Sequence, residues 1–257
     1  MSRYHPDALD GRDPALIKRM LPLLEVFNAG YFRLTWDGAE HLPVTPAMFV
    51  GNHNGGIMGP DLFCTLSVLW RGLKPETPLF ALAHDFAMRQ LTPLGRVLQK
   101  VGAISASRAN ADRALTSGGH VLVYPGGDLD AYRNSRRRNE VVISPRTGFI
   151  EVAQANDVPI VPVVAAGAHR SAYIFWEGEW LARRLRMQTW ARLERFSLAL
   201  ALPWGIAPGP WLPCLPLPFA VQLKILPPVH VSKREDVTRA GQRIQAMMQR
   251  ALEGMLT

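Results

Sequence analysis

AMFVGNHNGGIMGPDLF, residues 47–63, joins an apolar run to a glycine-rich loop and then to a helix-like segment. The uninterrupted apolar residues at 47–51 are typical of a strand that is buried on both faces. The loop that follows carries His53, and the helix-like segment covers 60–71. Strand, loop and helix in this order predict one unit of a parallel sheet covered by helices.

The same alternation recurs along the chain. Apolar runs lie at 47–51, 79–83, 120–124, 160–164 and 221–226. Helix-like stretches lie near 60–71, 86–100, 108–118, 147–156 and 179–195. The pattern predicts an α/β fold with a mostly parallel mixed sheet covered by helices on both faces.

Helices are also predicted at the two ends of the chain. Residues 14–34 form an amphipathic pattern entered through Asp13 as N-cap and Pro14 as the first helical residue. Near the other end, Ser232 and Glu235 have the spacing of a capping box. An apolar face follows, made of Val237, Ile244, Met248, Ala251 and Met255. We predict a single domain over 1–257, with an N-terminal helix in 1–45, a core at 46–230 and a C-terminal helix in 231–257.

Composition narrows the choice of partner and compartment. The chain of 257 residues has a formal net charge of +8, which favours an anionic partner such as nucleic acid, a phospholipid surface or a phosphorylated or CoA-linked substrate. Cys64 and Cys214 have no zinc or redox spacing, which indicates a reducing compartment. The first residues lack the apolar core of a secretory signal, so we expect an intracellular protein.

One long segment, 196–223, contains no charged residue. It is long enough to span a bilayer, which takes roughly 20 residues, but its six prolines exclude a single spanning helix. We expect it to be an apolar, proline-rich loop that covers the core or dips into the membrane interface. The segment before it combines arginines with tryptophans, as interfacial helices do, and a second basic cluster lies at 133–138. No nucleic-acid-binding module is recognisable.

His53 is the first candidate for catalysis. It follows a predicted strand, where ligand sites of α/β sheets gather, and Gly55, Gly56 and Gly59 leave room beside its ring. Asp61 is the nearest acid and is placed to orient the imidazole as a general base. The alternative is a plain glycine turn in which Asp61 caps the next helix.

The second candidate site is VLVYPGGDLDAYR, residues 121–133. The N–H groups of Gly126 and Gly127 are placed to form an anion nest. Asp128 and Asp130 are placed to bind a polar head group or the histidine. The alternative is a turn with solvated acids.

Two arginines precede predicted helices. Arg108 ends the motif GAISASR, and Arg146 stands just before the helix-like stretch at 147–156. Both are candidates for binding a phosphate or another anion at a helix N-terminus. The alternatives are a surface charge for Arg108 and a scaffold role for Arg146.

In order and content these motifs resemble the lysophospholipid acyltransferase superfamily, from about 48 to 164. The family's NH-x4-D motif matches Asn52 and His53, whereas the position of its aspartate holds Met58, three residues before Asp61. The block at 124–127, YPGG, and the string GIMG at 56–59 look more like the diacylglycerol and phytyl-ester acyltransferase branch.

The resemblance implies a reaction. His53 would take the proton of an acceptor hydroxyl as it attacks an acyl thioester, and Asp61 or Asp128 would hold the imidazole. Gly126 and Gly127 would stabilise the oxyanion. No covalent enzyme intermediate is implied, in keeping with the absence of a G-x-S-x-G motif. No metal is implied either, because the histidines at 53, 84, 120 and 169 have no ligand spacing. No cofactor is expected, and the expected acyl donor is acyl-CoA or acyl carrier protein.

The expected acceptor is a lysophospholipid, a glycerolipid or a lipid alcohol, and the expected location is the cytoplasmic face of a membrane, peripheral or monotopic. The expected substrate-binding residues are Asn52, Arg108, Tyr124, Gly126, Gly127, Asp130 and Arg146. Membrane lipids, but no nucleic acid, are the predicted partners, and no oligomeric state is predicted. Two alternatives remain open: an acyl thioesterase and a catalytically idle lipid-binding protein of the same fold.

Overall fold

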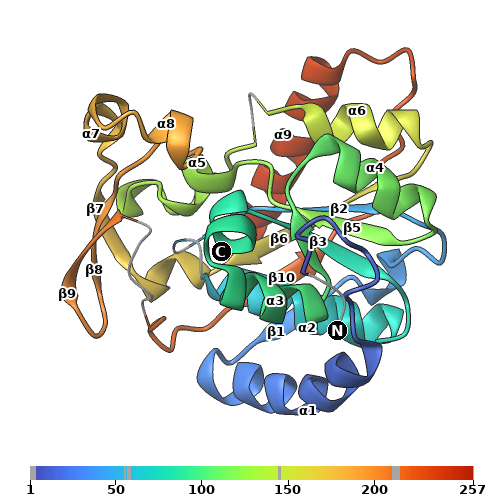
Figure 1. Cartoon of the computed structure of the whole chain (residues 1–257), viewed down its shortest axis with the longest axis horizontal. Helices are drawn as coiled ribbons and strands as arrows, with labels where there is room; N and C mark the ends of the chain where they lie inside the picture. The colour runs from blue at the N-terminus through green and yellow to red at the C-terminus, as the bar shows by residue number, and fades with distance from the viewer. Residues whose placement is uncertain (1–3, 55, 57–58, 144–145, 210–214, 257) are drawn as a thin grey trace.

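The computed structural model describes residues 4–54, 56, 59–143, 146–209 and 215–256. Among these, seven strands form a main sheet in the order β1 (Thr35–Asp37), β10 (Gln222–Ile225), β6 (Ile160–Ala166), β2 (Met48–Gly51), β5 (His120–Val123), β3 (Leu79–Ala83) and β4 (Ala103–Ser105). Only β10 and β6 pair in antiparallel fashion; the other neighbours are parallel. The predicted mostly parallel mixed sheet is therefore confirmed (Figure 1).

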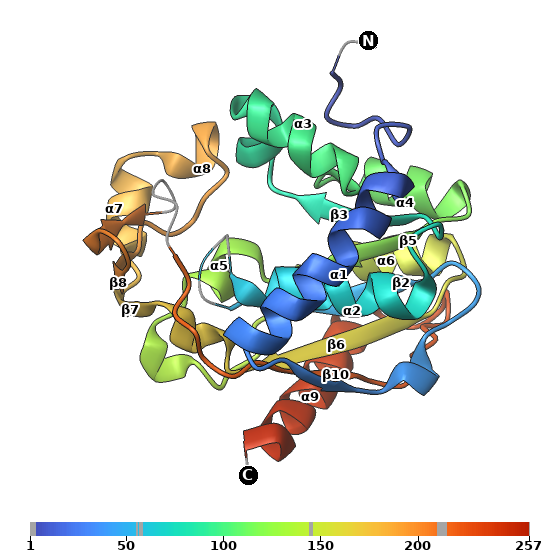
Figure 2. The same ribbon diagram turned by 90° about the horizontal axis from the view of Figure 1, so that it is seen from below.

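Helices cover both faces of this sheet. On one face lie α1 (Pro14–Tyr31) and α2 (Pro60–Leu73); on the other lie α4 (Arg108–Thr116), α6 (Gly148–Ala155) and α9 (Val237–Leu256). A π-helical turn at Phe86–Gln90 and α3 (Thr92–Lys100) connect β3 to β4. Figure 2 shows α1 crossing the sheet together with α2.

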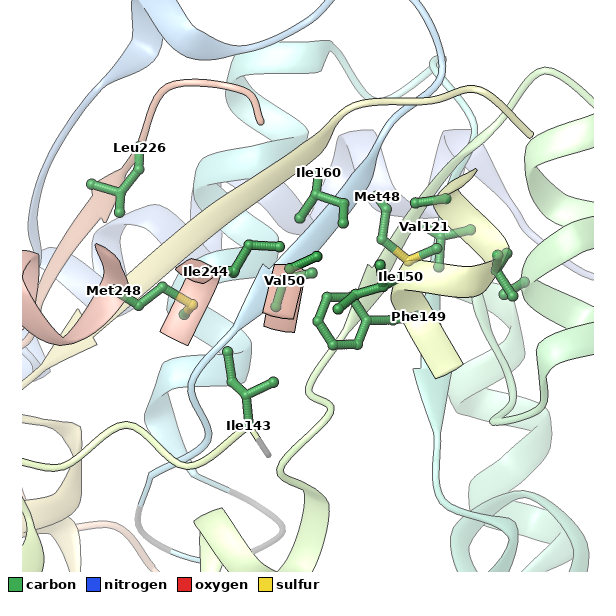
Figure 3. Packing of buried hydrophobic residues seen from close by; sticks show 14 of the residues in the cluster. Met48, Val50, Val121, Ile143, Phe149, Ile150, Ile160, Leu226, Ile244 and Met248 are labelled. Atoms are coloured by element: carbon green, nitrogen blue, oxygen red, sulfur yellow. The ribbon is translucent and has the colours of Figure 1, made fainter. Parts of the chain in front are cut away.

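The apolar strands are explained by this two-sided cover. In β2, Met48 and Val50 pack toward α6 and α9, whereas Phe49 packs toward α1 and α2. All three are fully buried. Figure 3 shows Met48 and Val50 among Phe149, Ile150 and Ile244 in the first of these clusters. A strand buried on both faces needs apolar residues at every position, which is why these runs do not alternate.

The N-cap predicted for the first helix is confirmed, whereas the N-cap predicted for the last helix is wrong. The side chain of Asp13 accepts a hydrogen bond from the N–H of Leu16 at 3.0 Å, as expected of the N-cap of α1. At α9 the cap is Asp236, whose carboxylate accepts from the N–H of Arg239 at 2.9 Å. Ser232 instead belongs to the turn before the helix, so the capping-box prediction is wrong.

The uncharged segment contains strands rather than a continuous loop. A second, antiparallel sheet joins β7 (Tyr173–Trp176), β8 (Leu198–Ala201) and β9 (Gly205–Pro208). This corrects the loop expected over 196–223, of which 210–214 lie outside the described residues. The sheet stands at one side of the molecule, beside α5 (Gly127–Ala131) (Figure 2). No described helix is long and apolar enough to span a membrane.

The single helix expected over 179–195 is also wrong. Two short helices, α7 (Glu179–Arg184) and α8 (Met187–Trp190), replace it, because Arg186 between them has a left-handed backbone with φ of 50°. Arg195 is buried and pairs with Glu177 rather than facing a membrane. Tertiary burial thus removes part of the basic surface expected from the sequence.

Candidate functional site

The site forms where β2 and β5 end side by side. Because these strands are parallel neighbours, with Val50 opposite Val123, the residues that follow them meet at the same edge of the sheet. The rings of His53 and Tyr124 have centroids 4.9 Å apart. Gly51 makes this approach possible, since a Cβ there would lie 2.4 Å from the Tyr124 ring.

His53 forms a buried pair with Asp61. The imidazole Nδ1 lies 2.9 Å from Oδ2 of Asp61, which is fully buried in the first turn of α2. The histidine side chain is 12% exposed, and no described residue hydrogen-bonds its Nε2. Gly59 is required beside the pair, because a Cβ there would lie 2.3 Å from Oδ1 of Asp61. Asp61 thus holds one ring nitrogen and leaves the other available.

The pair changes the basicity of the imidazole. Burial by itself lowers the pKa of His53, but the charge of Asp61 and its hydrogen bond raise the pKa by more. The net result is a pKa above the ordinary value of 6.5. A neighbouring carboxylate favours the imidazolium in this way because it offsets the cost of burying a positive charge. The ring is therefore equipped to accept a proton.

The structure decides between the two acids proposed as partners of the histidine. Asp128 hydrogen-bonds Arg146 at 3.0 Å through Oδ1 and accepts from the N–H of Glu194 through Oδ2. The prediction that Asp128 holds the imidazole is therefore wrong. Arg146 also lies 2.8 Å from the carboxylate of Glu194, so two acids already occupy the guanidinium expected to bind an anion.

The glycine turn after β5 offers one backbone donor rather than two. The N–H of Gly127 donates to the carbonyl of Tyr124 at 3.0 Å, so it is not available for an oxyanion. The N–H of Gly126 has no partner among the described residues. A Cβ on Gly126 would lie 2.1 Å from the carbonyl oxygen of Val142, so only glycine fits this position.

Asp130 anchors the histidine loop instead of binding a head group. It is fully buried, and its carboxylate accepts from the backbone N–H of His53 and pairs with Arg133. Burial raises the pKa of Asp130 to about 6, with the charge of Arg133 acting in the opposite direction. The expectation that Asp130 contacts substrate is thus not supported by its position.

Arg133 is the residue that sequence reasoning missed. It was expected on a basic surface loop, yet its side chain is fully buried. The guanidinium donates to the carbonyl of His53 at 3.1 Å, to the carbonyl of Asp130 at 2.8 Å and to the side chain of Asn54. No local signal distinguishes it from its exposed neighbours, because its partners in the histidine loop lie about eighty residues away.

Two further predicted residues have structural partners. The Asn52 side chain is fully buried and bonds both the N–H and the carbonyl of Ala165, at 2.8 and 3.0 Å, which ties the end of β2 to β6. These bonds give Asn52 a structural role between the two strands. Arg108 is exposed and pairs with Glu151 of α6, outside the cluster around the histidine. Gly55 and Met58 lie outside the described residues.

The family of the chain follows from comparison with known proteins. The family model described as diacylglycerol acyltransferase matches residues 12–255. The chain belongs to this family. The resemblance stated from the sequence motifs, with its diacylglycerol acyltransferase branch, is thus confirmed.

Individual relatives of this family member are distant. An uncharacterised protein of Mycobacterium tuberculosis is 28% identical over 194 residues, which cover 74% of this chain and 52% of the relative. Human diacylglycerol O-acyltransferase 2 is 28% identical over 162 residues, covering 58% of this chain and 40% of the human protein. The chain thus spans about half the length of the curated relatives it matches.

The same architecture occurs in a solved structure. The crystal structure of the 1-acyl-sn-glycerophosphate acyltransferase of Thermotoga maritima superposes with a TM-score of 0.54 at 18% identity. The match covers 92% of this chain and 80% of that protein. It establishes that the diacylglycerol acyltransferase family member described here has the acyltransferase fold.

Proposed function

We propose that this chain is an O-acyltransferase that moves a fatty acyl group from an acyl thioester to the hydroxyl of a glycerolipid, a lysophospholipid or a lipid alcohol. The observation that carries the proposal is the His53–Asp61 pair, with Nδ1 held at 2.9 Å, at the strand edge of a diacylglycerol acyltransferase family chain. The donor would be acyl-CoA or acyl carrier protein.

In this reaction Nε2 of His53 is the general base. Nδ1 donates to Asp61, so the acceptor hydroxyl gives its proton to Nε2 as its oxygen attacks the thioester carbonyl. The buried carboxylate offsets the charge of the imidazolium that forms. The carbon–sulfur bond then breaks, and the thiolate leaves and takes a proton from the imidazolium.

The tetrahedral intermediate carries its negative charge on the former carbonyl oxygen. The N–H of Gly126, which has no partner among the described residues, is the backbone donor proposed for this oxyanion. We further propose that the protein works at the cytoplasmic face of a membrane, as a peripheral or monotopic protein, because lipid acceptors reside there. The net charge of +8 suits an anionic bilayer and the phosphates of acyl-CoA.

The test is an acyl-transfer assay with palmitoyl-CoA and a panel of lipid acceptors, read by mass spectrometry. His53→Ala is expected to lower turnover by about 10²–10⁴-fold, the range supplied by general base catalysis. His230→Ala is the matched control, because His230 is exposed and follows Val229, which pairs with Ile160 at the opposite end of β6.

The products separate the remaining alternatives. An acylated acceptor made by the wild type and the His230→Ala variant, but not by His53→Ala, supports the transferase. Free fatty acid as the sole product would identify a thioesterase. If the wild type turns over neither palmitoyl-CoA nor palmitoyl acyl carrier protein, the chain is an idle lipid-binding protein and the proposal fails.

A further inference from the structure

The second sheet is apolar on both faces. Tyr173, Leu200 and Ile206 lie directly opposite one another across β7, β8 and β9, and their side chains are 50%, 48% and 60% exposed. We call this row the outer face. The other side of the sheet carries Ile174 and Ala199, which are buried. An antiparallel sheet with one face in water normally carries polar residues on that face. The exposed apolar residues of the outer face therefore indicate a binding surface.

Further exposed apolar side chains lie at the ends of these strands and on the two helices that join β7 to β8. Trp204 and Leu202 stand at the β8–β9 turn, Trp176 ends β7, and Trp180 and Trp190 lie on α7 and α8. Tryptophan and tyrosine are the residues that favour the boundary between lipid tails and water, because they combine an apolar ring with a polar group. The composition therefore matches a lipid interface.

The charges around the outer face are positive. Between Glu179 and Glu235 the only acidic residue is Glu194, which shares Arg146 with Asp128. Arg184 and Arg186, in contrast, are exposed and form no ion pair with a described residue. An apolar face bordered by uncompensated arginines is complementary to a bilayer with anionic head groups.

We propose that the outer face and its tryptophans dock onto an anionic lipid bilayer. The inference deepens the proposed function and rests on it for the nature of the substrate. The apolar side chains enter the interface, and the arginines of the α7–α8 segment bind the lipid phosphates.

This docking would bring the bilayer close to the catalytic loop. The buried side of the second sheet packs on Ala131 and Tyr132, which directly follow the Asp130 that anchors His53. The side chain of Asn134 donates to the carbonyl of Phe175 in β7 at 2.9 Å, and Ala131 accepts from the N–H of Gly56 in the histidine loop. The second sheet and the segment at 131–132 are therefore all that the cited contacts place between the proposed lipid surface and the histidine loop.

The apolar surface continues toward α1. Leu215 donates its N–H to the carbonyl of Leu202, and the hydroxyl of Tyr31 at the end of α1 donates to the carbonyl of Pro216 at 2.9 Å. Leu215 is exposed, as is Phe27 one turn before Tyr31. The segment at 215–219 thus bridges the second sheet and the apolar end of α1, which enlarges the surface that a bilayer covers.

The test is co-sedimentation of the full chain with phosphatidylcholine vesicles that contain or lack phosphatidylglycerol. Leu200→Ser/Ile206→Ser is expected to lower the partition coefficient at least about tenfold, because two apolar side chains no longer enter the lipid. Val44→Ser/Val97→Ser, which changes two exposed apolar residues outside the second sheet, is the matched control and should bind as the wild type does. Arg184→Gln/Arg186→Gln should lose about fivefold per arginine on anionic vesicles only.

Binding and turnover are measured separately. His53→Ala should bind vesicles like the wild type, and the outer-face variant should keep its turnover of a monomeric, short-chain acceptor, which shows that it is folded. Unchanged vesicle binding of the outer-face variant would overturn the docking proposal while leaving the acyl-transfer proposal intact. A change in the oligomeric state of the outer-face variant without a loss of vesicle binding would also overturn the docking proposal. The outer face would then join two copies of the chain.

Discussion

At the scale of single residues, the histidine is held by an acid that does not occupy the usual position. Asp61 lies eight residues after His53, in the first turn of α2, where its Oδ2 contacts Nδ1 of His53 and accepts from the N–H of Asn54. The carboxylate is buried and needs Gly59 beside it. An aspartate eight residues after the histidine is therefore able to hold Nδ1.

Asp61→Asn tests the electrostatic part of this contact. Asp61 helps to raise the pKa of His53 above its ordinary value, so its loss lowers that pKa, because only the smaller effect of the Asp130 charge then opposes burial. The base must be neutral to work, and activity in the wild type should therefore rise with pH through an apparent pKa above 6.5. In the variant this limb should move to lower pH, and the plateau of kcat/KM should fall by about 10²–10⁴-fold.

The measurement is a profile of kcat/KM against pH for both proteins. A limb that stays in place in Asp61→Asn would mean that the titrating group is not His53. Asp236→Asn, which changes the exposed cap of α9, is the control and should leave the profile unchanged.

At the scale of elements, the histidine loop is tied to the turn after β5 by a buried ion pair. Arg133 and Asp130 contact the carbonyl and the N–H of His53, respectively. Both side chains are fully buried, so the pair loses its hydration on folding. Such a pair contributes little to stability, and we interpret it as a device that positions the loop.

Replacing only Arg133 should lower the free energy of unfolding much more than replacing Arg133 and Asp130 together. Arg133→Met leaves the Asp130 carboxylate buried and unpaired, which should lower the free energy of unfolding by about 3–5 kcal/mol. Asp130→Leu/Arg133→Met should recover most of that loss, because no buried charge remains. Its kcat should nevertheless stay low, since the backbone of His53 has lost both anchors.

Urea unfolding and steady-state kinetics measure the two effects. A double variant with wild-type kcat would show that the pair is purely structural. A change confined to KM would likewise contradict a role in placing the general base.

At the scale of the whole molecule, the two faces of the main sheet have separate cores. The cluster around Met48, Ile150 and Ile244 (Figure 3) belongs to the face covered by α4, α6 and α9. Asp61 belongs to α2, which packs on the other face. Loss of packing in the first cluster should therefore reduce stability without moving the His53–Asp61 pair.

Ile244→Ala should lower the free energy of unfolding by about 2–5 kcal/mol, because the side chain is fully buried and leaves a cavity. The kcat of the folded fraction should stay within about twofold of the wild type. Arg250→Ala, an exposed position on the same helix, should change stability by less than about 0.5 kcal/mol. Denaturant titration measures the free energy of unfolding, and kcat is measured below the unfolding transition. A large fall in kcat would contradict the independence of this cluster from the His53–Asp61 pair.

Local sequence pattern predicts five of the seven described strands of the main sheet, the helices α1, α2, α4, α6 and α9, and the loop that presents His53; it does not predict the short strands β1 and β4. These features depend on periodicity, glycines and caps within a few residues of one another, which is the range over which local pattern acts. The strands β2, β3, β5, β6 and β10 lie within about two residues of the runs read from the sequence.

Only the tertiary structure decided which acid holds the imidazole, that Arg133 is buried, and that the second sheet exposes an apolar face. Asp130 reaches His53 across 77 residues of sequence, and Tyr173 meets Leu200 only through strand pairing. Burial and charge pairing depend on such distant contacts. A run of arginines therefore has the same local pattern whether its side chains lie in solvent, at a lipid surface or in the core beside His53.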